Sequence, residues 1–302
     1  MPVAIITGAS KGLGRELAAA LAGRGWDLAV DARSAGPLEA AARELRDAGA
    51  RVVALPGDVA DGGHRAALVA AARELGGLDL LVNNASVLGA EPLVRLAEQP
   101  LDGLRAALEV NVVAPLGLVQ EALPLLRTAS DSSGSPHSPV TSHSGVNGML
   151  SPYIGASDTE GPGGRRSATE RSSTGGPDGG EPGNSDLPLK ENESPYIGTS
   201  GAILSISSDA AVEAYPTWGG YGATKAALEQ QSAVPAEEEP GLRVWWADPG
   251  DMRTDLYAAA VPLDDGSGRP LPATVVPALL RLLDERPASG RYTAAELRDG
   301  AR

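Results

Sequence analysis

The fold of this chain is decided by the stretch VAIITGASKGLGRELAAAL, residues 3–21. A β-branched run ends at Thr7, glycines follow at Gly8, Gly12 and Gly14, and an Ala- and Leu-rich helix begins within the turn. Such glycines let the backbone bend tightly and approach a ligand, and the free N–H groups at a helix N-terminus attract phosphate. A glycine-rich turn alone is weak evidence, but here the required strand precedes it and the required helix follows it. The stretch therefore predicts a site for the pyrophosphate of a dinucleotide.

Short apolar strands alternate with helices along most of the chain. Strands are expected at residues 3–7, 26–30, 51–55, 78–82, 202–206 and 242–247. Helices are expected at residues 12–23, 37–48, 63–75, 101–126, 221–232 and 273–284. Strands separated by helices of about ten or more residues form βαβ units with a parallel sheet. The sequence therefore predicts an α/β protein with a Rossmann-type, doubly wound parallel sheet.

Residues 129–200 interrupt this pattern. Half of these 72 residues are Ser, Gly or Pro, and they carry nine acidic and four basic side chains. Such a composition cannot bury enough apolar area to offset the entropy lost on ordering, so we expect a disordered insertion. The remainder, residues 1–128 and 201–302, is expected to form one dinucleotide-binding domain. The sequence leaves open whether the insertion is native to the protein, a partner-docking arm or an unrelated passenger.

The composition disfavours several classes of function. The net charge is −14, which argues against unaided binding to nucleic acid or to an anionic membrane, because both need a basic surface. The chain has no cysteine, so disulfides, thiolate chemistry and Cys-based metal sites are excluded, and no metal is expected. The N-terminus lacks the features of a signal peptide, and no apolar run approaches about 18 residues. We therefore expect a soluble cytoplasmic protein.

Five further motifs accompany the glycine turn. In order they are NNAS at residues 83–86, Asn111 in the long helix, SISS ending at Ser208, YGATK at residues 221–225 and DPGDMRT at residues 248–254. Ser208 precedes Tyr221 by 13 residues. In this order and spacing the chain resembles the short-chain dehydrogenase/reductase family, which usually has NNAG where this chain has NNAS. The resemblance covers about residues 2–128 and 201–290.

The resemblance implies a hydride transfer between a nicotinamide cofactor and a small carbonyl or alcohol substrate. Tyr221 and Lys225 are four residues apart on a helix, so they share a face. A free tyrosine has a pKa near ~10, and a nearby ammonium lowers it. By the resemblance, Tyr221 exchanges the proton, Ser208 orients the substrate carbonyl, and Asn111 holds a water that connects Lys225 to solvent. Lys225 would also bind the nicotinamide ribose.

Further residues are expected around the cofactor and the substrate. The cofactor set that the resemblance implies is Gly8, Ser10, Lys11, Gly12, Leu13, Gly14, Arg33, Asp58, Val59, Asn84, Ala85, Lys225, Pro249, Gly250 and Thr254. The substrate set is Ser208, Trp218 and Tyr221, and Tyr215 is a further candidate for the same wall. Residues 253–272 are expected to form a mobile lid over the substrate.

The choice between NADP and NAD depends on the end of the second strand, in LAVDARS. An acid there binds the ribose 2′-OH of NAD, whereas a cation accepts the 2′-phosphate of NADP. By the family register the discriminating position is Ala32, Arg33 follows it, and Lys11 can reach the same phosphate. We therefore expect NADP, with NAD as the less favoured cofactor. If the register shifts by one residue, Asp31 occupies that position and repels the phosphate.

Pro235 departs from the pattern, because the helix that carries Tyr221 and Lys225 should continue through it. An interior proline removes a hydrogen bond and costs about 3 kcal/mol, so the later turns are expected to kink or end early. In the family this helix and the long helix with Asn111 usually pack against a partner subunit. A homo-oligomer is therefore one expectation, which Pro235 weakens.

Two functions are weighed. The first is an NADP-dependent carbonyl reductase or alcohol dehydrogenase, which predicts turnover of carbonyl substrates. The alternative is a non-catalytic NADP-binding regulator that docks partners through the insertion, which predicts tight cofactor binding without turnover. The complete set of Ser208, Tyr221 and Lys225 favours the enzyme.

Overall fold

The computed structural model describes residues 1–131 and 201–300. The expected disorder of the insertion therefore falls on residues outside the described ones. The expected start of the insertion at residue 129 is too early, because the helix before it continues to Asp131.

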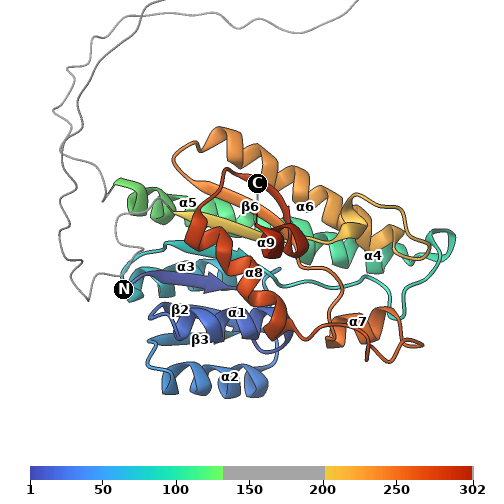
Figure 1. The fold of residues 1–302 in the computed structure, drawn as a ribbon, viewed down its shortest axis with the longest axis horizontal. Helices are drawn as coiled ribbons and strands as arrows, with labels where there is room; N and C mark the ends of the chain where they lie inside the picture. The colour runs from blue at the N-terminus through green and yellow to red at the C-terminus, as the bar shows by residue number, and fades with distance from the viewer. Residues whose placement is uncertain (132–200, 301–302) are drawn as a thin grey trace, which may run out of the picture. The chain divides into compact units, whose positions relative to one another are not determined.

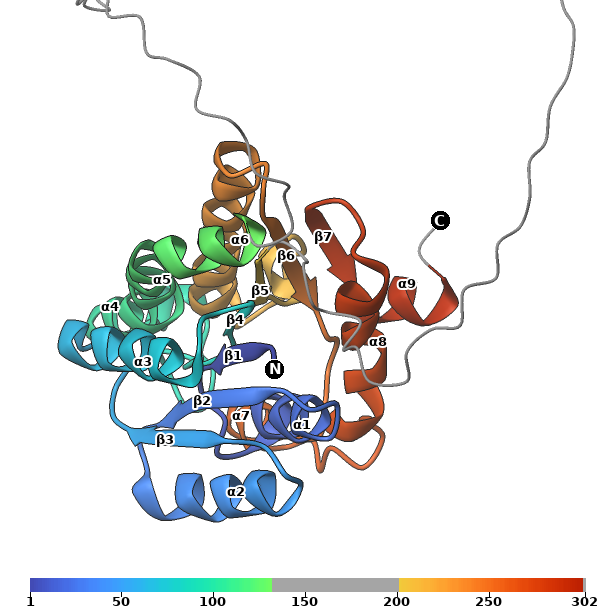
Figure 2. The same cartoon turned by 90° about the vertical axis from the view of Figure 1, so that its left-hand side faces the viewer.

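Seven strands form a single sheet in the order β3-β2-β1-β4-β5-β6-β7, and every neighbouring pair is parallel (Figure 2). The strands are β1 Val3–Ile6, β2 Asp27–Ala32, β3 Val52–Pro56, β4 Leu80–Asn83, β5 Ala202–Ile206, β6 Arg243–Asp248 and β7 Gly290–Thr293. Every residue of β1, β2, β4 and β5 is buried, as a parallel sheet covered on both faces requires. The predicted Rossmann-type sheet is confirmed. Strand β7 was not predicted, because GRYT is short and begins with glycine.

Helices cover both faces of this sheet (Figures 1 and 2). One layer holds α1 Gly12–Ala22, α2 Ala35–Asp47 and α8 Pro272–Glu285. The other holds α3 Gly62–Leu75, α4 Leu101–Leu108, α5 Ala114–Asp131 and α6 Gly219–Glu238. The shorter helices are α7 Asp255–Ala260, α9 Ala294–Asp299 and the 3-10 turns η1 Leu96–Glu98 and η3 Asp209–Ala211.

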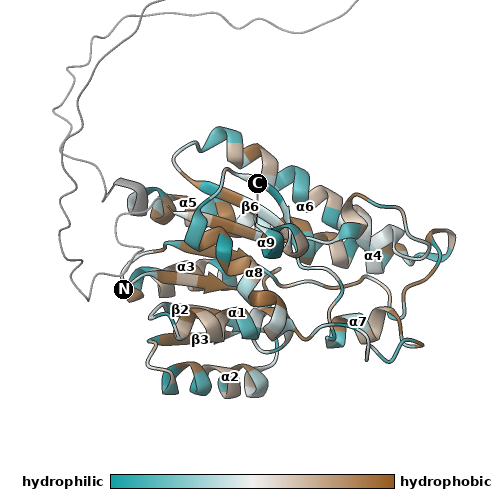
Figure 3. Ribbon diagram, in the orientation of Figure 1, coloured by the Kyte–Doolittle hydropathy of each residue, from teal (hydrophilic) through white to brown (hydrophobic). Residues whose placement is uncertain are grey.

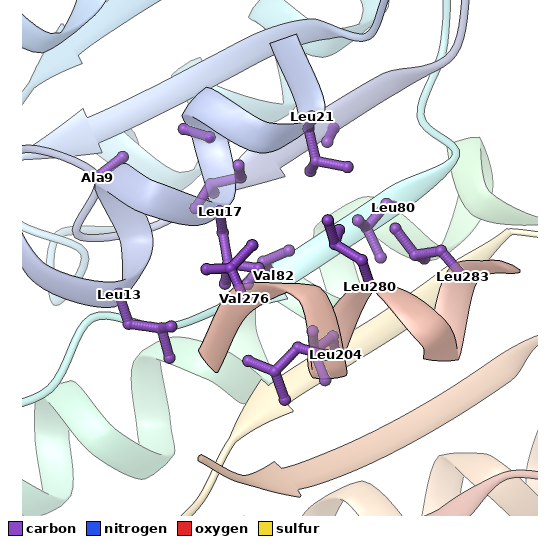
Figure 4. Packing of buried hydrophobic residues seen from close by; sticks show 14 of the residues in the cluster. Ala9, Leu13, Leu17, Leu21, Leu80, Val82, Leu204, Val276, Leu280 and Leu283 are labelled. Atoms are coloured by element: carbon purple, nitrogen blue, oxygen red, sulfur yellow. The ribbon is translucent and has the colours of Figure 1, made fainter. Parts of the chain in front are cut away.

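The helices α1 and α8 pack together on the middle of the sheet. Figure 4 shows their leucines and valine meeting the strand side chains Leu80, Val82 and Leu204. Figure 3 shows the same separation by hydropathy, with apolar residues along the strands and polar ones on the outer helix faces. Because α1 begins inside the glycine turn, this packing holds the turn at the carboxyl edge of the sheet.

The long helix expected at residues 101–126 is not one α-helix. A single π-helical turn, Glu109–Val113 (η2), joins α4 to α5 and contains Asn111. Such turns are frequent at functional sites. By length and composition Leu101–Thr128 could also cross a membrane, alone in this respect among the helices described. Helices packed in a protein core meet the same criteria, so this does not establish a span.

The expected early end of α6 at Pro235 is wrong, because the helix continues through it to Glu238. The φ angle of proline suits the helical backbone, although its ring removes one N–H donor and crowds the carbonyl four residues earlier. Leu228 and Ser232, on the turns before the proline, are buried, and packing on the sheet outweighs local propensity.

Candidate active site

A cavity of about 700 Å³ opens at the carboxyl edge of the sheet. Its lining includes residues that follow each of the first six strands, from the glycine turn after β1 to the segment after β6. Strand order reverses between β1 and β4, and ligands of open α/β sheets bind at such a switch point. The volume lies within the range typical of ligand sites.

Nearly all of the predicted site residues line this cavity. Those that do are Gly8, Ser10, Lys11, Gly12, Leu13, Arg33, Asp58, Val59, Asn84, Ala85, Ser208, Trp218, Tyr221, Lys225, Pro249, Gly250 and Thr254. Gly14 and Asn111 do not line it. Tyr215, the further candidate for the substrate wall, does not line it either: it is 39% exposed, and its hydroxyl donates to Asp209 and Glu213.

The glycines of the turn are needed for different geometric reasons. Gly8 and Gly12 have φ angles of +68° and +58°, in the left-handed region that favours glycine. A Cβ on Gly14 would lie 2.4 Å from Asn84 Nδ2 and 2.6 Å from the Gly8 carbonyl oxygen. Gly14 therefore allows α1 to pack against the turn, while Gly8 and Gly12 shape the surface that faces the cavity.

Thr7, which sequence reasoning did not single out, joins this turn to the loop after β4. Its Oγ accepts hydrogen bonds from the backbone N–H groups of Asn84 at 2.9 Å and Ala85 at 3.0 Å. In return, Asn84 Nδ2 donates to the Thr7 carbonyl at 2.7 Å. The Thr-Gly pair at the start of the motif was the signal for this residue.

Tyr221 and Lys225 lie at the cavity wall on the first turns of α6, and both are buried. Lys225 Nζ donates to the Ile206 carbonyl at 2.7 Å and lies 5.5 Å from the centre of the Tyr221 ring. Burial lowers the pKa of Lys225 to about 8, while Glu229 opposes that shift. Burial also raises the pKa of Tyr221 to about 12. The expected activation of the tyrosine by the ammonium is therefore outweighed by burial in the protein alone.

Ser208 lies at the end of β5, where it caps the turn η3. Its hydroxyl donates to Asp209 Oδ1 at 3.0 Å and accepts from the Ala210 N–H at 3.2 Å. To donate to a carbonyl oxygen in the cavity, the hydroxyl must turn away from Asp209.

Asn111 joins the loop after β4 to α6. Its Oδ1 accepts from the Val87 N–H at 2.9 Å, and its Nδ2 donates to the Val87 carbonyl and to Thr224 Oγ, both at 2.9 Å. The side chain therefore holds two walls of the cavity in register. The water relay expected of Asn111 stays a prediction.

Comparison with known proteins places the chain in a family. The family model described as short chain dehydrogenase matches residues 2–149 and 194–262. The chain belongs to the short chain dehydrogenase family.

Two relatives are similar to this chain. The 3-oxoacyl-[acyl-carrier-protein] reductase FabG of Staphylococcus aureus is 35% identical over 130 residues, 42% of this chain and 52% of the relative. The L-rhamnose 1-dehydrogenase (NAD(P)(+)) of a Sphingomonas species is 35% identical over 120 residues, 39% and 46%. The matched part therefore spans about half the length of these relatives.

Solved structures share the fold of this dehydrogenase. A short chain dehydrogenase from Shigella flexneri complexed with NADP has a TM-score of 0.69 at 22% identity and 97% coverage of both chains. An alcohol dehydrogenase from the archaeon Thermococcus sibiricus complexed with 5-hydroxy-NADP has a TM-score of 0.67 at 22% identity, covering 97% of this chain and 95% of the other. An NAD⁺-bound xylitol dehydrogenase has a TM-score of 0.57 at 19% identity, covering 83% and 70%.

Ser86, the last residue of NNAS, is a further cavity residue of this dehydrogenase. Its Oγ is buried and makes no hydrogen bond within the described residues. The presence of its hydroxyl lowers the pKa of Tyr221, against the larger effect of burial. The signal in the sequence was the departure from NNAG, to which no role was given.

The charged residues at and near the end of β2 lie in different environments. Asp31 lines the cavity but is buried, and its carboxylate is bound to the Gly8 N–H and His64. Arg33 is exposed and has no hydrogen bond or ion pair with any residue in the described ranges. Lys11 Nζ forms an exposed ion pair with Asp255 Oδ2 at 2.7 Å.

Within residues 1–131 and 201–300, no three His, Asp or Glu side chains group closely enough to hold a metal ion.

Proposed function

We propose that this protein is an NADP-dependent oxidoreductase that interconverts a carbonyl compound and an alcohol. One observation carries the proposal: Ser208, Tyr221 and Lys225 line the same cavity as the glycine turn. The activities of the two relatives, a 3-oxoacyl reductase and a sugar dehydrogenase, support this class of reaction.

The cavity fits a dinucleotide on its own geometry. The positive φ angles of Gly8 and Gly12 open the backbone toward the cavity, and α1 directs its first N–H groups there. Residues of the turn would hold the pyrophosphate, Asp58 and Val59 would flank the adenine, and the residues after β6 would hold the remainder. The unpaired Arg33 and the NADP-bound structural neighbours support NADP over NAD.

When bound, the cofactor supplies the hydride to the carbonyl carbon. The proton comes from Tyr221, whose phenol is protonated at neutral pH, the form that donates. Ser208 orients the carbonyl oxygen toward this hydroxyl. Lys225 lies beneath the Tyr221 ring, where its ammonium stabilises negative charge that develops on the phenol.

The substrate side of the cavity suits an apolar or aromatic carbonyl compound. Trp218 is half-buried, and its ring meets the Tyr221 ring edge-on at a centroid distance of 5.7 Å. The segment after β6, expected as a lid, supplies Leu256, Tyr257 and Ala259 to the lining. These apolar walls would exclude water from the reacting carbonyl.

The test is NADPH oxidation with a panel of ketones and aldehydes, comparing wild type with Tyr221→Phe. Loss of the proton donor should lower the rate at least about 100-fold. Tyr215→Phe is the matched control, because Tyr215 lies outside the cavity, and it should keep the wild-type rate. Equal rates for wild type and Tyr221→Phe would sink the mechanism.

The non-catalytic regulator has no observation in its favour. Its docking arm falls on residues outside the described ones, and the catalytic set is complete. NADPH binding without turnover of any carbonyl would nevertheless support it. The cytoplasmic location stays a prediction from the sequence.

A homo-oligomer is part of this proposal. Three apolar side chains are exposed on η2, α5 and α6: Val113 at 46%, Leu116 at 39% and Val234 at 43%. In the short chain dehydrogenase family these helices usually pack against a partner subunit. Burial of such side chains by a second copy would stabilise a dimer. Light scattering of wild type and Leu116→Glu would test it.

A further inference from the structure

An acid lies at the end of β2, yet both of its oxygens are occupied. The Gly8 N–H donates to Asp31 Oδ1 at 2.8 Å, and His64 Nε2 lies 3.0 Å from Asp31 Oδ2. Because a carboxylate only accepts, Nε2 carries the hydrogen and donates. The Asp31 side chain is 1% exposed and that of His64 is 10% exposed.

The surroundings of His64 are shaped to hold its ring in this place. Asp61 caps α3 by accepting from the His64 backbone N–H at 2.8 Å, which sets the first turn of the helix. The imidazole fills the space beside Gly57, where a Cβ would lie 2.2 Å from Nδ1. A side chain at position 57 would therefore displace the ring from Asp31.

The pleat of β2 places Asp31 and its neighbours on opposite faces of the sheet. Ala32 packs with the α1 and α8 side chains, whereas Ala29 packs with the α3 and α5 side chains. Asp31 shares the face of Ala29, because side chains two residues apart point the same way. His64 reaches it from α3 on that face.

We infer that His64 is a positioning residue that determines cofactor selectivity. By binding Asp31 Oδ2 it holds the carboxylate on the α3 side of β2, so Arg33 is the charge that this strand end presents to the ribose 2′-position. The chain thereby accepts a 2′-phosphate although it carries an acid next to Ala32. This inference rests on the proposed NADP-dependent function.

Removal of the imidazole should reverse the preference. Asp31 Oδ2 would be left buried and unpaired, which is costly, so the carboxylate would turn toward the cavity. There it repels the 2′-phosphate of NADPH, whereas the ribose 2′-OH of NADH can donate to it. The affinity for NADPH should fall and that for NADH should hold or rise.

The experiment is direct titration of the full chain with NADPH and with NADH, followed by cofactor fluorescence. For His64→Ala the ratio of NADPH to NADH affinity should fall about tenfold relative to wild type, as one unscreened repulsion near the surface would produce. Asp31→Asn in the His64→Ala background should restore the ratio. Glu74→Ala is the matched control, because it removes an exposed charged side chain from the same helix outside the cavity, and it should keep the wild-type ratio.

The outcomes separate the inference from the function on which it rests. An unchanged ratio in His64→Ala, a failure of Asp31→Asn to restore it, or the same loss in Glu74→Ala would overturn the role of His64 alone. Wild type that does not favour NADPH would overturn the proposed cofactor together with the inference. If His64→Ala does not fold, Asp31→Asn alone decides: a ratio at or above wild type supports the inference, and a fall opposes it.

Discussion

At the scale of single residues, burial moves Tyr221 and Lys225 toward their neutral forms. The pKa of Tyr221 rises to about 12, and the pKa of Lys225 falls to about 8. The nearby acids Asp248 and Asp209 raise the pKa of Tyr221 further. Among the described residues that affect this pKa, Ser86 is the one that lowers it. The motif therefore supplies the two titratable groups, and burial has the largest effect on where they titrate.

Ser86→Ala should raise the pKa of Tyr221, because it removes the hydroxyl that lowers it. Oxidation of an alcohol needs the phenolate, so kcat/KM for oxidation should be lower than that of wild type at alkaline pH, by up to about tenfold. Ser205→Ala removes a hydroxyl from β5 outside the cavity and is the control. Coincident profiles for Ser86→Ala and wild type would show that Ser86 does not act on Tyr221.

Lys225 should make stability depend on pH, with a sign that follows from its burial. Its pKa is 10.5 in a free chain and about 8 in the folded protein, so between these values the unfolded state binds more protons. The free energy of unfolding therefore rises with pH across this window. Wild type should gain stability relative to Lys225→Met from pH 8 to pH 10.5, measured by urea unfolding. A difference that stays constant with pH would contradict the lowered pKa.

At the scale of elements, α6 shows tertiary packing overriding a local signal. The proline leaves the Gln231 carbonyl without its intrahelical donor, while the side chain of Gln231 donates to the Val112 carbonyl on η2 at 3.0 Å. This bond ties α6 to the π turn that carries Asn111. The two elements that hold Asn111 and the proposed catalytic residues Tyr221 and Lys225 are thus joined beside Pro235.

Pro235→Ala should stabilise the protein by about 1–3 kcal/mol, since it restores an N–H donor to the helix and the gain exceeds the entropy that proline removes from the unfolded chain. Urea unfolding measures the change. Pro272→Ala is the control, because Pro272 is at the start of α8, where no intrahelical N–H bond exists to restore. A gain for Pro272→Ala equal to that for Pro235→Ala would show that the missing bond is not the cause.

At the scale of the whole molecule, the two described residues on either side of positions 132–200, Asp131 and Gly201, lie near each other. Gly201, just before β5, approaches the Leu126 backbone so closely that a Cβ would lie 2.5 Å from the Leu126 carbonyl oxygen. From Leu126 to Asp131 is about 7.5 Å of helix. Both ends belong to the amino edge of the sheet, opposite the cavity. The domain can therefore be closed there without the residues between them.

Replacing residues 132–200 by a linker of about six Gly and Ser residues should preserve NADPH turnover, because such a linker spans up to about 20 Å. The shorter loop should add about 2 kcal/mol to the free energy of unfolding through its lower closure entropy. A linker of about 20 residues should give an intermediate value. Lower stability or lost turnover in both proteins would show that the segment contributes to the domain.

The sequence by itself determined the alternating strands and helices, the glycine turn and the order of the motifs, because each depends on residues close together in the chain. The hydrophobic pattern of β1, β4 and β5 is enough to predict a covered parallel sheet. Tyr221 and Lys225 could be paired from their spacing on a helix, and all but three of the predicted site residues, Gly14, Asn111 and Tyr215, line one cavity.

Only the tertiary structure decided how distant groups use each other. Asp31 looked like a competitor for the ribose until His64, 33 residues later, was found beside it. Lys225 Nζ donates to a carbonyl of β5, 19 residues away, rather than to the tyrosine. Burial raises the pKa of Tyr221, against the expectation from spacing alone, and it lowers that of Lys225. Hydrogen bonding and desolvation depend on what lies within a few ångströms in space, and the chain brings those atoms together only when it folds.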